Sequence, residues 1–252
     1  MKHVKLLLFF LFLSVCGMFA QNPRLTTAES HAIRAFVNDV KNGRKELVAK
    51  AVSYPVDRKY PLEPIRSENE FLIHYDEFID ASVIDLLIDA EWDRYGWRGI
   101  SCDSNILWGE IDENGEFSVY SFGLNSNGES RWKESVESQR IRLHSSLRDF
   151  DTPEIMFKSG RYTIRIDRMP DESYRYASWK DGKSISSRPD IIITGGTLDV
   201  QGTMHNKCYS FRNGEYEYQV IYGGFWESGA FALTVSKNSQ VLLTQQDGEM
   251  IY

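Results

Sequence analysis

The feature of this sequence that most constrains its fold is a series of short segments of alternating hydrophobicity in its C-terminal part. Apolar and polar side chains alternate over residues 161–166 and again over residues 174–179, which is the period of a strand with one buried face. Turn-forming pairs such as Asn213-Gly214 separate these segments. About eight short strands in roughly 95 residues predict a small all-β sandwich or barrel over residues 151–252.

The first part of the chain carries helix signals instead. Thr26 and Glu29 have the spacing of a capping box, which predicts a helix that begins at this point. A short second helix is expected over residues 44–52. Three prolines between residues 54 and 65 exclude a helix from that segment, which we expect to be extended and looped.

A second capping signal and a hairpin signal follow. Ser67 and Glu70 repeat the spacing of the capping box and predict a further helix. Three short strands are then expected between residues 97 and 122, because Asn114-Gly115 separates two alternating segments there. Strands that are short and adjacent in sequence favour an antiparallel arrangement.

Helices followed by such strands form an α+β pattern. For residues 21–150 we expect N-terminal helices packed on a curled antiparallel sheet, in a cone-like domain. A polar loop is expected after residue 124, followed by a packing or linking helix over residues 131–147. A proline-containing segment at residues 149–154 marks the predicted boundary with the all-β domain of residues 151–252.

Residues 1–20 have the pattern of a signal peptide. Lys2 and Lys5 precede an apolar run of about ten residues, which is too short to span a membrane, and small residues then lead to Ala20. A signal peptide that is cleaved after Ala20 would direct the protein to the periplasm or the extracellular space. The alternative is an outer-membrane lipoprotein with a lipid anchor at Cys16. No other apolar run is long enough for a transmembrane segment.

The charge of the chain bears on its partners. The formal net charge is −7, and it becomes about −9 once the two lysines of the signal segment are removed. Binding to nucleic acid needs clusters of Lys and Arg, so no nucleic-acid partner is expected. The expected partner is an unidentified protein, for which the acidic charge favours a basic one, or a small ligand. Cys102 and Cys208 either form a disulfide or stay as separate thiols.

The sequence contains no recognisable catalytic or metal-binding motif. It has no Gly-x-Ser-x-Gly elbow, and its carboxylates lack the spacing of a calcium loop. Asp76, Glu77 and Asp80 are expected to lie on a solvated helix face. His74 lies beside them, where it can hydrogen-bond a carboxylate or stay exposed. We therefore predict no catalytic residue, no metal and no cofactor.

Aromatic and charged side chains concentrate between Tyr54 and Trp108. Some of these aromatic residues must form the core, and the others are available to contact a ligand in the cone or on its surface. Arg98 lies at an expected strand start, where its alternative role is a salt bridge to a helix carboxylate. The predicted ligand-binding residues are Tyr54, Tyr75, Asp76, Trp97, Arg98 and Trp108.

The same stretch carries a recognisable pattern. It contains Tyr54-Pro55-Val56, Glu70-Phe71, Tyr75-Asp76-Glu77-Phe78, Trp97-Arg98-Gly99-Ile100 and Ile106-Leu107-Trp108. In these motifs it resembles a group of uncharacterised exported bacterial proteins, and the N-terminal half is more loosely similar to the NTF2-like α+β cone. The sequence departs from the group at residues 101–105, where the group has a Gly-Asn-Gly turn. The group implies no activity, and NTF2-like folds host enzymes, ligand binders and dimerisation modules alike.

These observations favour a non-enzymatic, exported binding protein of the bacterial envelope, whose partner is a ligand or a protein. One specific form is an immunity or inhibitor protein that neutralises a toxin or hydrolase, since an acidic face speeds the encounter with a basic cleft. A second alternative is an NTF2-like enzyme with His74 or a carboxylate as base in the cone. A third is a structural envelope protein, which predicts an exposed sheet edge or a large apolar patch.

Overall fold

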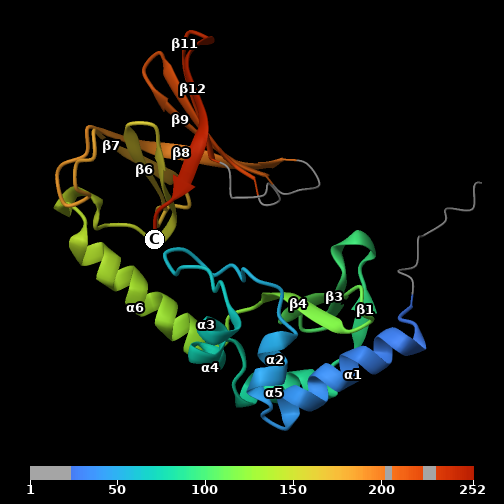
Figure 1. Ribbon diagram of the computed structural model, residues 1–252. Coiled ribbons are helices and arrows are strands. Elements are labelled where there is room, and N and C mark those ends of the chain that lie inside the picture. The colour runs from blue at the N-terminus through green and yellow to red at the C-terminus, as the bar shows by residue number, and fades with distance from the viewer. Residues whose placement is uncertain (1–23, 202–205, 224–230) are drawn as a thin grey trace, which may run out of the picture.

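The computed structural model describes residues 24–201, 206–223 and 231–252, and it places a helix-and-sheet part next to a β-barrel (Figure 1). The predicted signal peptide and the lipid anchor at Cys16 lie outside the described residues. In the described residues, no helix is both long and apolar enough to cross a membrane.

The first part begins with five helices, four of which are shorter than ten residues. They are α1 (Thr27–Lys41), α2 (Lys45–Lys50), α3 (Glu68–Ile73), α4 (Tyr75–Phe78) and α5 (Ala81–Asp89). The predicted capping box at the start of α1 is confirmed, because Thr26 and Glu29 each accept a hydrogen bond from the other's backbone N–H. At α3 the Ser67 hydroxyl accepts from the N–H of Glu70, but the Glu70 carboxylate accepts from Arg66 instead.

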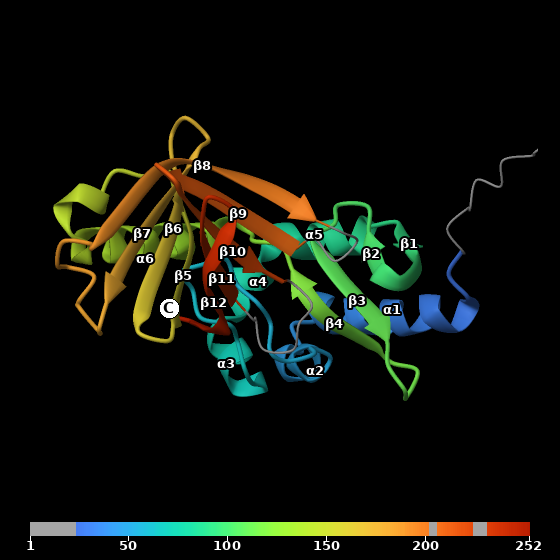
Figure 2. The same ribbon diagram turned by 90° about the horizontal axis from the view of Figure 1, so that it is seen from above.

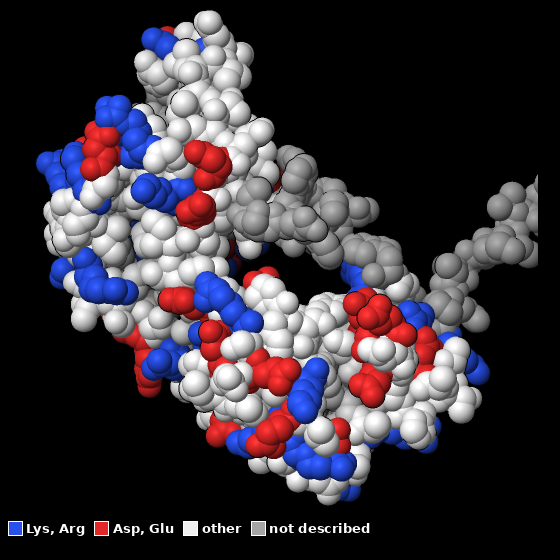
Figure 3. Space-filling model, viewed as in Figure 1, with Lys and Arg blue, Asp and Glu red and all other residues white. Residues whose placement is uncertain are grey.

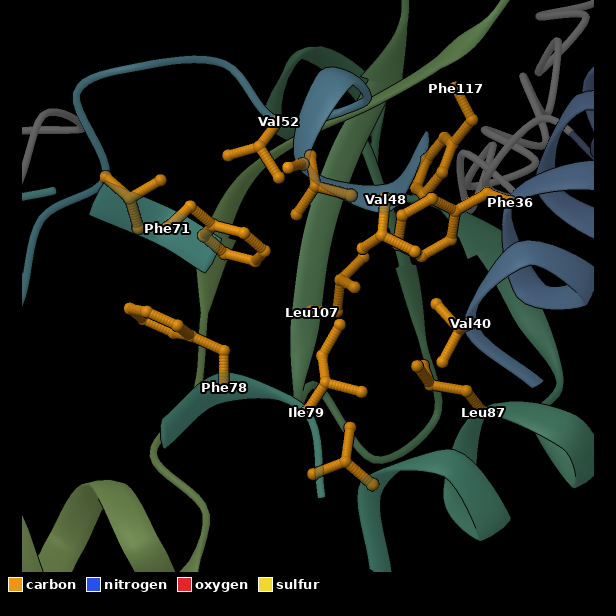
Figure 4. Close-up of a cluster of buried hydrophobic side chains, with 14 of the residues drawn as sticks. Phe36, Val40, Val48, Val52, Phe71, Phe78, Ile79, Leu87, Leu107 and Phe117 are labelled. Carbon is orange, nitrogen blue, oxygen red and sulfur yellow. The ribbon is translucent and has the colours of Figure 1, made fainter. Parts of the chain in front are cut away.

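A small antiparallel sheet follows, in the strand order β1-β2-β3-β4. Its elements are β1 (Trp92–Arg94), the short 3-10 helix η1 (Gly96–Arg98), β2 (Ile100–Cys102), β3 (Leu107–Ile111) and β4 (Phe117–Phe122). The predicted Asn114-Gly115 turn connects β3 to β4. The helices cover one face of this sheet, and Figure 4 shows their apolar side chains meeting Leu107 and Phe117 in a common core.

The second part is a closed barrel of eight antiparallel strands. The strands are β5 (Thr152–Ser159), β6 (Tyr162–Arg168), β7 (Tyr174–Lys180), β8 (Ile191–Gln201), β9 (Asn206–Asn213), β10 (Tyr216–Tyr222), β11 (Phe231–Lys237) and β12 (Gln240–Met250). Each strand pairs with the next along the chain, and β12 returns to β5. This is an up-and-down barrel, in which alternate residues of every strand point inward.

Aromatic side chains fill much of the barrel interior. The rings of Phe157 and Phe231 stack with centroids 4.5 Å apart, and Tyr222 stacks on the same Phe231 ring at 4.7 Å. Tyr176 packs against Phe211 at 5.5 Å. An eight-stranded barrel is just wide enough for side chains to fill, and the buried cluster here is of that kind.

The helix α6 (Ser126–Arg142), followed by the 3-10 turn η2 (Ser145–Leu147), packs on the outer wall of the barrel. Trp132 and Val136 of α6 share a buried cluster with Ala177 and Trp179 of β7. Figure 2 shows α6 running beside the strands β5 to β7. The helix therefore covers the outward-facing side chains of this wall, which would otherwise be exposed.

Beneath α6 the wall also buries charged side chains. Asp167 forms ion pairs with Arg165, at 2.5 Å, and with Arg175, at 2.7 Å. The contact with Arg165 lacks the alignment of a hydrogen bond, whereas the contact with Arg175 has it. Arg175 also donates to the backbone oxygens of Leu147 and Asp149. These carbonyls stabilise the excess positive charge of two arginines against one aspartate.

The looped segment of residues 53–66, between α2 and α3, holds the two parts together through its contacts with α6. The indole N–H of Trp132 donates to the backbone oxygen of Tyr60 at 2.8 Å, and Gln139 donates to the Tyr60 hydroxyl at 2.7 Å. Burial raises the pKa of Tyr60 to about 12, so the hydroxyl stays neutral in this contact. The ammonium of Lys59 lies 3.2 Å from the centroid of the Trp132 ring. The segment is thus fixed to α6 and through it to the barrel.

The prediction of an NTF2-like cone followed by a sandwich is wrong. The strands β1 and β2 have only three residues each, and four of the five helices have fewer than ten, so this part does not form a helix-packed cone. Of the two all-β alternatives the structure has the barrel, because the last strand pairs with the first of the series. The closing contact consists of two residue pairs, Glu249 with Lys158 and Met250 with Phe157.

The predicted loop after residue 124 is also wrong. Helix α6 begins at Ser126, because the side chain of Asn125 accepts a hydrogen bond from the N–H of Gly128 at 2.8 Å and caps the helix. Gly128 lies so close to α4 that a Cβ atom there would approach the Glu77 carbonyl oxygen to 2.6 Å. The polar residues that suggested a loop therefore lie in the first turns of α6, and Gly128 permits the close packing of α4 and α6.

Candidate functional site

Three of the predicted binding residues lie on the helical side of the small sheet. Tyr75 is buried, with its ring 5.8 Å from that of Phe71, and Tyr54 is half-buried and donates to the backbone oxygen of Ala49 at 2.8 Å. Asp76 is exposed and forms an ion pair with Lys45 at 3.1 Å. The two tyrosines therefore belong to the core of this part, and the aspartate belongs to its surface.

The other predicted residues lie elsewhere. Trp108 points away from the core shared by its neighbour Leu107, and its ring lies 5.2 Å from that of Tyr95. Arg98 is exposed at the end of η1, and its backbone oxygen accepts a hydrogen bond from Tyr120. The backbone of Trp97 lies in η1, and its side chain is outside the described part. The predicted set is thus divided between the two faces of the sheet.

A hollow at the junction of the two parts brings together more charged and polar side chains than either of these groups. Its volume is about 370 Å³, and it is lined by residues of the looped segment, of α3 and α6, and by Tyr252. We call it the junction hollow. Four arginines line it, Arg58, Arg66, Arg131 and Arg142, against two carboxylates, Glu63 and Glu70. In a chain with a net charge of −7, this is a local excess of positive charge.

One of these arginines is fixed by its contacts. Arg58 pairs with Glu77 at 3.0 Å, and both side chains are largely buried, with 8% and 15% of their surface exposed. The second Glu77 oxygen lies 2.7 Å from the Nδ1 atom of His74, which also lines the hollow. Arg58 donates in addition to the backbone oxygen of Glu63 at 2.5 Å. The carboxylate of Glu77 thus orients both a guanidinium and an imidazole at the hollow.

The other arginines keep most of their donors available. Arg66 pairs with Glu63 at 3.1 Å and Arg131 with Glu134 at 3.5 Å, and both arginine side chains are more than half exposed. The Nε atom of Arg142 donates to the backbone oxygen of Ser138 at 3.3 Å. Within the described residues, Arg142 has no ion-pair partner. Exposed pairs of this kind contribute about 0–1 kcal/mol each, so an incoming anion can displace them.

Apolar groups form the remaining wall of the junction hollow. Leu62 and Ile65 are buried, and Pro61 and Pro64 lie beside them. The ring of Tyr252 lies 6.5 Å from that of Tyr60, and burial raises the pKa of Tyr252, so its phenol is neutral. The hollow therefore combines donors for an anionic group with a surface for an apolar one.

Two other hollows lie along α1. The larger has a volume of about 880 Å³ and is lined mainly by apolar side chains such as Ala32, Phe36, Leu47 and Phe117. The other, of about 400 Å³, lies between α1 and α5. Neither brings several charged donors together from separate elements. Ligand sites combine apolar walls with a few convergent polar groups, so the junction hollow is the stronger candidate.

Sequence reasoning singled out His74 but missed the arginines. They lie at positions 58, 66, 131 and 142, in a loop, at the start of a helix and on α6, with no common motif. The local signal that could have pointed to them is the proline-rich segment, whose irregular backbone lies between the two parts. The contact of His74 with a carboxylate, one of its two expected environments, is present.

The structure also bears on metals and disulfides. Among residues 24–201, 206–223 and 231–252, no group of three or more potential ligands could hold a metal ion. Cys102 and Cys208 are separate, buried thiols, so of the two alternatives the disulfide is not formed. Burial raises the pKa of the Cys208 thiol, which keeps it protonated and unreactive.

Comparisons with known proteins give no relative. No family model, no curated protein and no solved structure matches this chain.

Proposed function

We propose that this protein binds a small organic anion reversibly in the junction hollow and does not transform it. The observation that carries the proposal is the convergence of four arginines, two from the looped segment and two from α6, on one hollow of an otherwise acidic chain. Arginine presents a planar fork of N–H donors that matches a carboxylate or a phosphate group. A site between two packed parts is also a common place for ligand binding.

The arrangement favours an anion with an apolar body. Arg131 and Arg142 lie on α6 and would receive the charged group, because neither is held by a buried partner. Leu62, Pro64 and the ring of Tyr252 would contact the apolar portion. The volume of about 370 Å³ suits a ligand at the small end of the usual range.

The cellular setting of this function is part of the same proposal. The signal pattern of residues 1–20 favours a protein exported to the periplasm or the extracellular space, with an outer-membrane lipoprotein as the alternative. There it would hold an anion of the cell envelope or of the surroundings.

An immunity or inhibitor function has weaker support from the geometry. It depends on an acidic face at Asp76, Glu77 and Asp80. Glu77 is largely buried against Arg58, and Asp80 caps α5 and hydrogen-bonds Ser82. Only Asp76 remains well exposed, with 75% of its side-chain surface in contact with solvent.

A second candidate function is catalysis on the bound anion. It is favoured by the contact of His74 with Glu77, because a carboxylate that orients an imidazole is a common arrangement for a general base. Under this alternative, substituting His74 by Gln would abolish turnover of a bound anion while leaving its affinity nearly unchanged. Simple binding predicts instead that the anion is recovered chemically intact after long incubation with the protein.

Isothermal titration calorimetry on the purified protein tests the proposal. The probes are benzoate, citrate and inorganic phosphate, with a neutral amide of benzoate as the uncharged comparison. We expect saturable binding of at least one anion and none of the amide. Removing one charge-assisted contact costs about 1.5–3 kcal/mol, so Arg142→Ala and Arg131→Ala should each weaken binding about tenfold or more.

Arg161→Ala is the matched control. Arg161 is exposed to the same degree as Arg131, 56% against 55%, but lies on the barrel in a pair with Asp181. Its substitution should leave the affinity unchanged. The absence of binding for all three anions would refute the proposal, and so would an equal loss of affinity in the control.

A further inference from the structure

The junction hollow contains negative groups as well as positive ones, and the two kinds lie side by side. The carboxylates of Glu63 and Glu70 line it together with the arginines. Glu63 pairs with the Nη1 atom of Arg66 at 3.1 Å, and Glu70 accepts a hydrogen bond from the backbone N–H of Arg66 at 2.7 Å. The wall of the hollow around Arg66 therefore presents both signs of charge within a few residues.

Each of these two carboxylates keeps one oxygen available. The contacts of Glu63 and Glu70 with Arg66 both use the Oε2 atom. Among the residues that the structure describes, no hydrogen bond is made to the Oε1 atom of either glutamate. The side chain of Glu63 is 62% exposed, so its pair with Arg66 contributes little to stability and a ligand can exchange it. Both carboxylates can thus accept hydrogen bonds from a group in the hollow.

The helix α6 brings positive charge beside this wall. The indole N–H of Trp132 donates to the backbone oxygen of Tyr60 at 2.8 Å, which holds residues 61–63 next to this turn of α6. Arg131 directly precedes Trp132 and lines the hollow. An arginine of α6 and a carboxylate of the looped segment therefore reach the hollow from two segments that are bonded to each other.

We propose that the carboxylate bound in the junction hollow belongs to an α-amino acid with an apolar side chain. This inference rests on the proposed function and specifies its ligand. At neutral pH an α-amino acid carries a carboxylate and an ammonium group on the same carbon atom. The arginines of α6 receive the carboxylate, and the Oε1 atoms of Glu63 and Glu70 accept hydrogen bonds from the ammonium group. The apolar side chain contacts Leu62, Pro64 and the ring of Tyr252.

Charge matching favours a ligand with both groups over a plain anion. A carboxylate ligand without an ammonium group would lie near two negative side chains and leave their free oxygens without a partner. A cation without a carboxylate would instead meet four arginines. A site built to hydrogen-bond a given group strongly rejects the analogue that lacks it. The mixed lining of the hollow therefore selects a zwitterion.

Isothermal titration calorimetry with three probes of similar size tests the ligand class. L-phenylalanine carries both charges, 3-phenylpropionate lacks the ammonium group, and phenethylamine lacks the carboxylate. We expect L-phenylalanine to bind about tenfold or more tightly than either analogue, because each analogue loses charge-assisted hydrogen bonds. Equal or tighter binding of 3-phenylpropionate would overturn this inference and leave anion binding in place. No binding of L-phenylalanine would also overturn it, and the proposed function fails only if benzoate, citrate and phosphate do not bind either.

Variants of the two glutamates test the groups assigned to the ammonium. Glu63→Gln and Glu70→Gln keep a hydrogen-bonding oxygen and remove the negative charge. Each should lower the preference for L-phenylalanine over 3-phenylpropionate, and the double variant should bring it close to one. Glu215→Gln is the matched control, because Glu215 is 63% exposed and pairs with Lys237 on the barrel at 3.3 Å. A preference that persists in the double variant, or that falls equally in the control, would contradict the inference.

Discussion

Among the carboxylates that the structure describes, Asp167 is the most deeply buried. Its side chain is fully buried between Arg165 and Arg175, whose exposed fractions are 0% and 4%. The Phe150 ring lies 5.0 Å from the Arg165 guanidinium and adds a cation–π contact. Burying three charges is expensive, and the arrangement is stable only while all three are present.

We therefore expect Asp167→Asn to destabilise the fold strongly. The substitution leaves two buried guanidinium groups without a counterion, which costs about 3–5 kcal/mol of unfolding free energy. Urea denaturation followed by circular dichroism measures this. Asp181→Asn is the comparison, because its pair with Arg161 is about half exposed and should contribute less than about 1 kcal/mol. Similar losses for the two variants would show that the buried network is not structural.

At the start of α1, Glu29 predicts a dependence of stability on pH. The hydrogen bond from the backbone N–H of Thr26 and the contact with Arg94 lower the pKa of Glu29 in the folded protein. A carboxyl whose pKa is lower in the folded state stabilises the fold above its unfolded pKa. That stabilisation is lost as the pH falls through the folded pKa.

Glu29→Gln should accordingly be less stable than the parent protein at pH 7, and the difference should shrink below about pH 5. Thermal unfolding at a series of pH values measures the difference. A gap between the two proteins that stays constant from pH 7 to pH 3 would contradict this role of Glu29.

At the scale of elements, the strand β8 shows where sequence reasoning succeeds and fails. The alternating segments of the barrel were predictable because each strand has one face inward. A glycine pair such as that at residues 195 and 196 is typical of a turn between strands, yet both residues lie inside β8. Gly196 leaves room for the ring of Phe211 from β9, a contact that the sequence of β8 alone cannot reveal.

Gly196→Ala is therefore expected to destabilise the barrel. The new methyl group would overlap the Phe211 ring in the filled interior, and overpacking of this kind costs about 1–3 kcal/mol. Chemical denaturation measures the loss. The double variant with Phe211→Leu should recover part of the stability lost by Gly196→Ala, relative to Phe211→Leu alone. Additive losses would mean that the two residues do not interact.

Other elements differ from prediction for non-local reasons. Closure of the barrel depends on the contact between β12 and β5, which are far apart in the sequence. Three strands of the small sheet and the hairpin between β3 and β4 were predictable, but its fourth strand, β1, was not. The cone inferred from the similarity to NTF2-like folds failed at this point.

At the scale of the molecule, α6 and the looped segment connect the two parts. The hydrogen bonds of Tyr60 with Trp132 and Gln139 fix the segment, and Gln139 also contacts Arg165 of the barrel wall. The junction hollow forms where these elements meet. Its arginines come from positions far apart in the sequence, and only the packing of α6 beside the segment brings them together.

On the face shown in Figure 3, acidic and basic side chains are interspersed on both parts.

Hydrogen–deuterium exchange with and without a saturating anion tests the central claim most directly. The account predicts that the anion slows exchange in two segments, residues 58–66 and residues 131–142, and that Arg142→Ala removes this protection. Protection confined to the barrel interior or to the hollows along α1 would contradict it, as would an unchanged exchange pattern at saturation.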